Sequence, residues 1–404
     1  MSERRDILIV GGGLNGPMLA IALAQSGFTV TLIDATPAPE HLNDDFDGRA
    51  YALALTSCRL LRAVGLWDDL APNAQPMTEI KVTDGRAGEG PSPFMMHFDH
   101  AEIEEGPMGH MVEDRHLRRA LHTALGQTEA IRHVTGTEVV GQAVDFGSVT
   151  VTLADGRSHA GTLLVGADGR SSGTAQRAGI KRQGWGYDQT AVVCAVEHER
   201  DHDGIAHQFF MPTGPLAILP LTGRRSAIVW SEATARASDL MAMDAPAFLD
   251  ALRPAFGSFL GEIALVGQRY SYPLGLSLAE QFIADRIALI GDAAHGVHPI
   301  AGQGLNAGLR DVAALVDVLQ AARTRGEDIG AQRPLLDYER WRRFDTAGLA
   351  VATDTFNRLF SNDNPVLRLV RDVGMAAVSS APALRRGFIR EAAGLTGDLP
   401  SLMQ

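Results

Sequence analysis

The stretch RIALIGDAAHGVHPIAGQGLNAGLRD, residues 286–311, is the most informative part of the sequence because it joins a buried strand, a lone carboxylate and a helix that begins with glycines. Residues 287–290 form a short apolar run that predicts a parallel strand, and Asp292 follows its carboxyl end, where open α/β sheets bind their ligands. Residues 302–306 then open a helical pattern, so backbone N–H groups and the positive end of a helix face the same crevice. A carboxylate that accepts from sugar hydroxyls beside such a helix end predicts a flavin site.

A second motif lies near the start of the chain, where residues 6–34 show the strand–helix–strand pattern of a dinucleotide-binding unit. Its loop, GGGLNG over residues 11–16, follows an apolar strand. Gly11 permits the tight turn, Gly13 lets the backbone approach a pyrophosphate, and Gly16 lets the helix lie close on the strand. The loop residues that we expect to bind the cofactor are Gly11, Gly13, Leu14, Asn15 and Gly16.

The acidic residues at strand ends indicate which dinucleotide is bound. Asp34 ends the second strand of the unit, where a carboxylate can bind both hydroxyls of an adenosine ribose, so a 2′-phosphate is disfavoured there. Another apolar strand, TLLVGADG over residues 162–169, places Asp168 at its carboxyl end. The stretch 286–311 supplies the third carboxylate. One glycine-rich loop alone is weak evidence, but the three segments together indicate FAD.

Composition restricts the class of protein. The chain has 404 residues, of which 45% are hydrophobic, and a formal net charge of -12, which opposes nucleic-acid binding. Cys58 and Cys194 stand far apart with no paired spacing, which fits a reducing cytoplasm. The first residues run straight into a strand, and no apolar run reaches the ~18 residues of a membrane span. We therefore expect a cytoplasmic protein in which any membrane contact is peripheral.

The expected fold class is α/β with an α+β second domain, that is, a Rossmann-like FAD-binding domain, an antiparallel-sheet substrate domain and a helical C-terminus. Strand-like runs between residues 185 and 230, punctuated by Pro and Gly, indicate the separate sheet. We interpret the Pro/Gly-rich stretch 85–93 as a mobile connection. The expected division is an FAD-binding domain over 1–75, 105–180 and 276–345, a substrate domain over 76–104 and 181–275, and a C-terminal helical segment over 346–404.

The order of the three motifs resembles that of the class A flavoprotein monooxygenases of the para-hydroxybenzoate hydroxylase type. Within that class, three longer segments resemble the ubiquinone-biosynthesis hydroxylases of the UbiH/UbiF group. They are RAYALALTS over residues 49–57, AHQFFMPTGPLAILPL over residues 206–221 and HGVHPIAGQGLN over residues 295–306. The resemblance covers most of the chain and implies the para-hydroxybenzoate hydroxylase fold.

The resemblance also assigns roles to individual residues. It implies that Arg49 lies against the FAD pyrophosphate and flavin, and that Asp168 and Gly169 stand where FAD and NAD(P)H cross. Asp292, preceded by Gly291, would bind the FAD sugar or ribityl chain. The residues that would line the isoalloxazine ring are Pro299, Gly302, Gln303, Gly304, Leu305 and Asn306.

One position departs from the family's pattern. The Asp-Gly motif commonly continues as DGxxSxxR, and here Ser172 is kept while Ala175 occupies the arginine position. Arg177 is the candidate to compensate for the missing charge. If it does not, either NAD(P)H handling or the packing near Asp168 differs from that of the family.

The activity implied by the resemblance is that of an FAD-dependent monooxygenase, which takes a hydride from NADPH or NADH and uses O2 as co-substrate. A flavin C4a-hydroperoxide would hydroxylate the aromatic ring of a polyprenylphenol intermediate in ubiquinone biosynthesis. Three alternatives stay open. The chain could hydroxylate a small soluble phenol or other aromatic, serve as a low-turnover FAD-binding scaffold subunit of a ubiquinone-biosynthesis complex, or reduce polyprenyl double bonds as a flavin reductase.

His295 and His298 stand three residues apart and suggest either a metal site or acid–base chemistry. A zinc site needs further clustered ligands, and the remaining histidines are scattered, so we expect no metal. The candidate catalytic residues are His298, as a proton relay beside the flavin, and its neighbour Pro299. The alternative is that His298 only packs or hydrogen-bonds there.

The region 365–395 is locally basic in this acidic chain, because five arginines stand against one aspartate and one glutamate among apolar residues. One interpretation is a peripheral contact with the inner face of the cytoplasmic membrane, which would deliver a polyprenyl substrate. The alternative is a helix that packs on the body of the protein and keeps its arginines in water.

Overall fold

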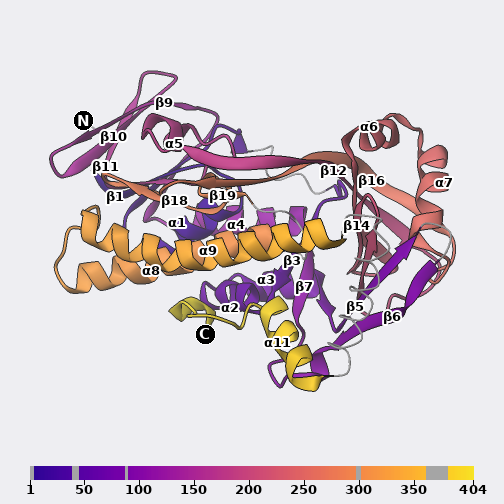
Figure 1. The fold of residues 1–404 in the computed structure, drawn as a ribbon. Coiled ribbons are helices and arrows are strands. Elements are labelled where there is room, and N and C mark those ends of the chain that lie inside the picture. Colours follow the sequence, from indigo (N-terminus) through magenta and orange to yellow (C-terminus); the bar gives the residue numbers. More distant parts are fainter. Residues whose placement is uncertain (1–3, 39–44, 87–89, 297–301, 361–380) are drawn as a thin grey trace.

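The computed structural model describes residues 4–38, 45–86, 90–296, 302–360 and 381–404. Figure 1 shows a parallel sheet at one end of the molecule, an antiparallel sheet at the other, and long strands that run between them. Two long helices, α8 (Gln303–Thr324) and α9 (Gln332–Phe360), lie side by side along the parallel sheet.

The first sheet contains the dinucleotide-binding unit. Its parallel strands are β18 (Ile287–Leu289), β11 (Ser158–Gly166), β1 (Arg5–Val10), β2 (Val30–Ile33) and β8 (Ile131–Val134), in that spatial order. The antiparallel additions are β17 (Ile283–Ala284), β9 (Val139–Asp145) and β10 (Ser148–Leu153). The parallel strand that the opening stretch predicts is therefore confirmed, as β18 beside β11.

Residues 7–10 of strand β1 are buried on both faces of the sheet, which explains why all four are apolar. Ile7 and Ile9 belong to the main core, together with residues of α8, α9, α1 (Asn15–Gln25) and α4 (Asp114–Gln127). Leu8 and Val10 point the other way, toward the β9–β10 hairpin. The carboxyl end of β1 is thereby held in a fixed position, and the glycine loop follows it.

The second sheet has eight strands in the order β19-β16-β12-β15-β14-β13-β5-β6. These are β19 (His295–Gly296), β16 (Ile263–Ala279), β12 (Arg182–His198), β15 (Arg225–Ala233), β14 (Gly214–Leu221), β13 (Ile205–Met211), β5 (Glu79–Arg86) and β6 (Gly90–Asp99). Its pairings are antiparallel except that β5 lies parallel to β13. Strands β12 and β16, of 17 residues each, extend from this sheet to the first one.

The two faces of the second sheet have different neighbours. Helices α6 (Thr234–Ala242) and α7 (Ala245–Phe256) cover one face, against residues such as Val192 and Ile228. The opposite face meets a small antiparallel sheet of β3 (Ala50–Ala54), β7 (Gly109–Glu113) and β4 (Ala74–Met77). The short helices are α2 (Leu55–Ala63), α3 (Trp67–Leu70), α5 (Gly173–Arg177) and the 3-10 turns η2 (Ala71–Asn73), η3 (His100–Glu102), η4 (Gly291–Ala293) and η6 (Ser401–Met403).

The C-terminal helix α11 (Pro382–Ala392) packs on β6, with Ile389 fully buried. Arg385 pairs with Glu102 at 2.7 Å, and Arg390 pairs with Glu105. Two of the basic-region arginines are thus engaged with the body of the protein, as the packed-helix alternative expects. Arg368 and Arg371 of the same region lie outside the described residues.

The stretch 85–93, which we interpreted as a connection, belongs mostly to strands. Strand β5 continues to Arg86 and β6 begins at Gly90, with Gly85 opposite Pro91. β6 is an edge strand, where a proline costs no ladder hydrogen bond, so the Pro/Gly content was misleading.

Among the helices of the described residues, none has the length and apolar character to cross a membrane.

Candidate active site

The loops that follow β1 and β11 lie against each other at Gly11. A Cβ added at Gly11 would stand 2.2 Å from the carbonyl oxygen of Ala167, and Gly11 has a φ of +117°, so only glycine fits there. A Cβ at Gly16 would stand 1.9 Å from the carbonyl oxygen of Gly11, so glycine lets α1 approach β1. A Cβ at Gly13 would meet no described atom within 4 Å. The backbone at Gly13 therefore borders open space that a pyrophosphate can fill.

Asp34 follows β2 directly and is only 5% exposed. A Cβ at Gly12 would stand 1.8 Å from Oδ2 of Asp34, so the carboxylate lies against the glycine loop. Its Oδ1 accepts from the N–H of Thr36 at 3.0 Å. Leu14, also expected at the cofactor, packs into the main core and offers no polar side-chain group.

Asn15 links the glycine loop to the stretch 286–311. A Cβ at Gly291 or Gly308 would stand 2.3 or 2.4 Å from Nδ2 of Asn15, so a side chain at either position would displace the Asn15 amide. The buried Oδ1 of Asn15 has no hydrogen-bond partner among the described residues. A buried acceptor without a partner is costly, and a ribityl hydroxyl of FAD would satisfy it. The open space at Gly13 and this acceptor both fit FAD.

Asp168 stands after β11, and its carboxylate is engaged within its own loop. Oδ1 accepts from the hydroxyl of Ser172 at 2.5 Å, and Oδ2 accepts from the N–H and hydroxyl of Thr174 at 2.9 and 2.8 Å. Gly169 has a φ of +78° and gives the loop its turn. The hydrogen bonds of the Asp168 carboxylate therefore stabilise the conformation of this loop.

The departure at Ala175 is not repaired by a hydrogen bond from Arg177 to Asp168. Arg177 donates instead to Oε1 of Gln142 at 3.2 Å and to the carbonyl of Val139 at 3.1 Å. Ala175 itself is 1% exposed, so the position that the family gives to an arginine is part of the core here.

Asp292 lies in the turn η4 just past β18, and its side chain is 43% exposed. Its Oδ2 accepts from Nε of Arg170 at 3.1 Å. Because β2, β11 and β18 run in the same direction, Asp34, Asp168 and Asp292 lie at one edge of the parallel sheet. This is the edge at which the sequence predicts the cofactor.

Helix α8 begins at Gln303, with Gly302 as its N-cap in the left-handed region at φ +64°. A Cβ at Gly304 would meet no described atom within 4 Å, and Leu305 is partly buried against the main core. The side chain of Asn306, in contrast, is fully used by the protein. Its Oδ1 accepts from Ala54 N–H and the Ser57 hydroxyl, and its Nδ2 donates to the carbonyls of Ala52 and Gly302, at 2.7–2.9 Å. Asn306 therefore fixes the start of α8 on β3 and α2.

His295 is 1% exposed, and its Nε2 lies 2.6 Å from Oδ2 of Asp311. The described part of the chain contains no group of three His, Cys, Asp or Glu side chains that could hold a metal ion. His298 and Pro299, the candidate catalytic residues, lie outside the described residues.

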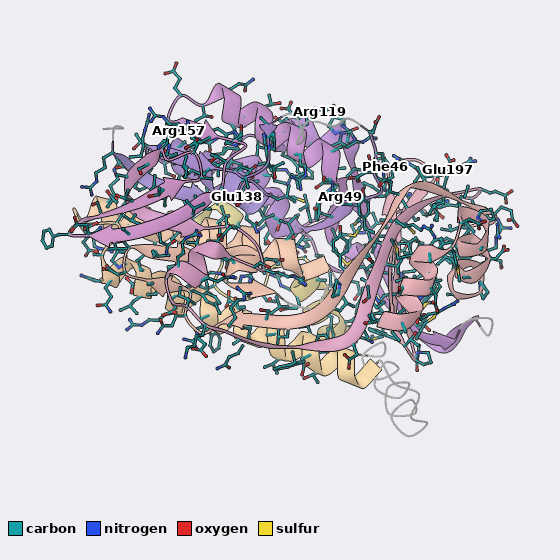
Figure 2. The ribbon with its side chains drawn as sticks, turned by 90° about the horizontal axis from the view of Figure 1, so that it is seen from above. Phe46, Arg49, Arg119, Glu138, Arg157 and Glu197 are labelled. Carbon is teal, nitrogen blue, oxygen red and sulfur yellow. The ribbon has the colours of Figure 1, made fainter. Side chains whose placement is uncertain are left out.

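Arg49 directly precedes β3 and lies against Tyr270 of β16, at the junction of the small sheet and the second sheet (Figure 2). Its Nη2 is 2.6 Å from Oδ2 of Asp47 and 3.2 Å from Oδ2 of Asp114, and its guanidinium lies 5.4 Å from the ring centre of Tyr270. Burial alone would lower the pKa of Arg49, but the bond to Asp47 and the charge of Asp114 raise it above its ordinary value. Arg49 is thus a half-buried, permanently charged group at the junction.

Two aromatic residues at this junction were not singled out from the sequence. Tyr270 and Tyr272 are stacked with ring centres 6.5 Å apart, and Tyr272 is 44% exposed. Both lie on the β16 face opposite α6 and α7, because their partners Val193 and Ala191 alternate with Val192 of the core. The Tyr-Ser-Tyr alternation in a strand carried that signal, but the sequence did not tell which face it lines.

Known proteins with the same features were found by sequence and by structure. Residues 4–349 match the family model described as FAD binding domain. The chain is 45% identical over 402 residues to ubiquinone hydroxylase UbiL of Rhodospirillum rubrum, covering 99% of this chain and 92% of that protein. It is 35% identical over 397 residues to the 3-demethoxyubiquinol 3-hydroxylase of Escherichia coli, covering 98% of this chain and all of that protein, 100%.

Among solved structures, p-nitrophenol 4-monooxygenase PnpA of Pseudomonas putida superimposes with a TM-score of 0.80 at 19% identity, covering 98% of this chain and 99% of that one. This likeness concerns the fold, and it confirms the expected α/β architecture of the para-hydroxybenzoate hydroxylase type. The chain therefore belongs to the ubiquinone hydroxylase family of FAD-binding aromatic monooxygenases.

Proposed function

We propose that this protein hydroxylates the aromatic ring of a polyprenylphenol intermediate in ubiquinone biosynthesis, with FAD as cofactor, O2 as co-substrate and NADPH or NADH as electron donor. The observation that carries the proposal is the convergence of Asn15, Asp34 and Asp292 at one edge of the parallel sheet. The 45% identity to a ubiquinone hydroxylase, over nearly the whole of both chains, supports the substrate class.

Bound FAD would accept a hydride and react with O2, which is the chemistry that the side chains cannot supply. The chain's contribution is to hold and orient the cofactor. In this proposal Asp34 binds the adenosine ribose, Gly13 admits the pyrophosphate, and Asn15 and Asp292 bind the ribityl chain. The start of α8 would direct its free backbone N–H groups toward the negative charge of a reduced flavin.

We place the substrate ring against the second sheet, on the face opposite α6 and α7. That face offers the stacked Tyr270 and Tyr272 for a phenol ring. The carbonyl of Pro273, next to Tyr272, accepts from Arg170, which also bonds Asp292, so the tyrosines lie close to the cofactor edge. The proposal keeps the division into an FAD-binding domain, a substrate domain and a C-terminal segment with the boundaries given above.

The proposed setting is the cytoplasm, with a peripheral membrane contact through α11. On this helix, Leu384 and Phe388 are 56% and 41% exposed, and they are one helical turn apart. Arg386 is exposed on the same helix. The apolar pair suits insertion into a lipid interface, from which a polyprenyl substrate would be taken, and Arg386, on the other side of the helix, adds to the attraction to anionic lipid. A ubiquinone-biosynthesis complex is the second proposed partner.

The test is product analysis with the purified FAD-loaded protein, a short-chain prenylphenol, NADPH and 18O2. We expect NADPH oxidation coupled to a product that carries one 18O atom on its ring. NADPH oxidation coupled to hydroxylation of soluble phenols alone would favour the soluble-substrate alternative, and product formed without oxygen would favour the reductase. A protein that binds FAD but does not turn over would favour the scaffold.

A further inference from the structure

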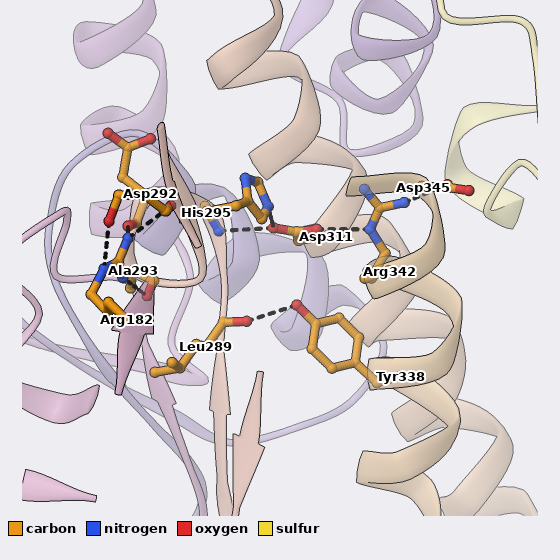
Figure 3. Close-up of polar contacts among 11 residues, drawn as sticks. Arg182, Leu289, Asp292, Ala293, His295, Asp311, Tyr338, Arg342 and Asp345 are labelled. Atoms are coloured by element: carbon orange, nitrogen blue, oxygen red, sulfur yellow. Dashed lines mark hydrogen bonds and ion pairs between the residues drawn. The ribbon is translucent and has the colours of Figure 1, made fainter. Parts of the chain in front are cut away.

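The turn that presents Asp292 is held from the inside by one buried carboxylate (Figure 3). Oδ2 of Asp311 accepts from the N–H of Gly291 at 2.8 Å and lies 2.6 Å from Nε2 of His295. Gly291 precedes Asp292 and His295 follows three residues after it, so one oxygen atom fixes both ends of the turn. Asp311 is 0% exposed and cannot itself touch a ligand in the crevice.

The orientation of that carboxylate is in turn set by helix α9. Arg342 donates from Nε to Oδ1 of Asp311 at 2.7 Å and from Nη1 to Oδ2 of Asp345 at 2.7 Å. Burial alone would raise the pKa of Asp311, but His295 and Arg342 lower it below its ordinary value. Asp311 is therefore a buried anion with its partners on both oxygens, which is the condition under which a buried charge is tolerated.

The carbonyl side of the same turn is held by the second sheet. Arg182, at the start of β12, donates to the carbonyl of Asp292 at 3.1 Å and to the carbonyl of Ala293. Asp311 holds the N–H side of the turn and Arg182 holds its carbonyl side, so the backbone of the turn has little freedom to move. The exposed carboxylate of Asp292 therefore extends from a rigid backbone segment.

We propose that Asp311 and Arg342 are positioning residues for the cofactor: from behind the turn, they fix Asp292 in the place where it binds FAD, and so set the affinity for FAD without touching it. The inference rests on the proposed role of Asp292. It assigns a cofactor-dependent role to α9, whose Arg342 is linked to the turn through Asp311. A purely structural role would instead predict loss of stability without a specific loss of FAD affinity.

The test is a titration of apoprotein with FAD, followed by flavin fluorescence, beside the melting temperature of each apoprotein. The first variant is Asp311→Asn, in which a neutral amide replaces the carboxylate that accepts from Gly291 and Arg342. The second is Arg342→Lys, which keeps the positive charge but loses the planar Nε donor. The matched control is Tyr338→Phe. Tyr338 lies one turn before Arg342 on α9, is equally buried, and donates to the carbonyl of Leu289 at 2.8 Å, so its loss weakens the α9–β18 contact without reaching the turn.

We expect Asp311→Asn to raise the Kd for FAD roughly 10- to 100-fold, as the loss of charge-assisted hydrogen bonds implies. Arg342→Lys should raise it by a smaller factor, on the order of ten, and Tyr338→Phe should stay within about two-fold although its melting temperature falls. Affinities within two-fold of wild type in both Asp311→Asn and Arg342→Lys would overturn the inference.

If Asp311→Asn does not fold, the FAD affinities of Arg342→Lys and His295→Asn test the inference instead, and values within two-fold of wild type in both would overturn it. An FAD affinity that falls equally in Tyr338→Phe would also overturn the inference, because it would show a general loss of structure. Failure of the wild-type protein to bind FAD is a different outcome, which would overturn the proposed function itself.

Discussion

Asp292 is the residue on which the assignment of the cofactor site depends most. Its carboxylate is 43% exposed at the strand edge, and its described partner is Arg170 at 3.1 Å. Replacing it with alanine removes hydrogen bonds to a charged acceptor, each of which contributes about 1.5–3 kcal/mol. We expect Asp292→Ala to purify without the yellow colour of FAD, with a Kd raised at least about ten-fold. Asp155→Ala, on an exposed hairpin ion pair, is the control, and normal FAD affinity in Asp292→Ala would refute the role.

A substitution at Gly13 can distinguish an effect on FAD binding from an effect on folding. A Cβ there would meet no described atom within 4 Å, so Gly13→Ala should leave the melting temperature of the apoprotein unchanged. The same methyl group would enter the space assigned to the pyrophosphate, at a cost of about 1–3 kcal/mol, and should raise the Kd for FAD about ten-fold. Gly126→Ala, in helix α4, is the control that should raise stability and leave FAD affinity unchanged. Unchanged FAD binding by Gly13→Ala would place the pyrophosphate elsewhere.

His110 gives the stability of the protein a dependence on pH. Burial, with the charge of Arg62, lowers the pKa of His110 from 6.5 to about 4. The unfolded chain therefore takes up this proton more readily, and the stabilising effect of neutral His110, complete above pH 6.5, is lost as the pH falls toward 4. In His110→Asn the drop in melting temperature between pH 7 and pH 5 should be smaller, by on the order of 1 °C. His100→Asn is the surface control, and parallel curves for wild type and His110→Asn would contradict the assignment.

At the scale of elements, α11 is where the membrane proposal can be tested. Deleting the region 365–404 would remove Ile389 and Met403 from the core, so point variants are the better experiment. We expect Leu384→Ser with Phe388→Ser to reduce flotation with phosphatidylglycerol-containing vesicles about ten-fold or more, since each side chain contributes roughly 1.5–3 kcal/mol when buried. Phe146→Ser, which changes a fully exposed phenylalanine on the β9–β10 hairpin, should float like wild type. Equal flotation of all three proteins would exclude α11 as the contact.

The elements that the sequence predicts well are those in which local pattern and burial agree. Residues 7–10 of β1 and strand β18 are apolar because both their faces are covered, and the helix starting at Gln303 follows a glycine N-cap. Strand β6 was missed because prolines usually argue against a strand, and only its edge position makes them harmless. Edge position is a property of the assembled sheet, so no window of sequence reveals it.

For the molecule as a whole, the sequence predicts which strand ends lie close together, but not which interior residues support those strand ends. The three carboxylates follow from the topology of parallel strands. The bond between Asp311 and Arg342 joins residues on two helices, and the stacking of Tyr270 and Tyr272 at the junction depends on which face of β16 turns toward the small sheet. Arg177 was the candidate to compensate for the arginine missing at Ala175, whereas it donates to Gln142 and Val139 of β9.

The proposed reaction of this protein introduces an oxygen atom into the ring of a ubiquinone precursor. The most direct test is quinone profiling by mass spectrometry in a strain that lacks this chain and no other hydroxylase of the pathway, complemented with wild type or with Asp292→Ala. We predict that the deletion accumulates a polyprenylphenol missing one ring oxygen, that wild type restores ubiquinone, and that Asp292→Ala does not. An unchanged ubiquinone level in the deletion strain, or full restoration of ubiquinone by the FAD-depleted variant, would contradict the proposed function.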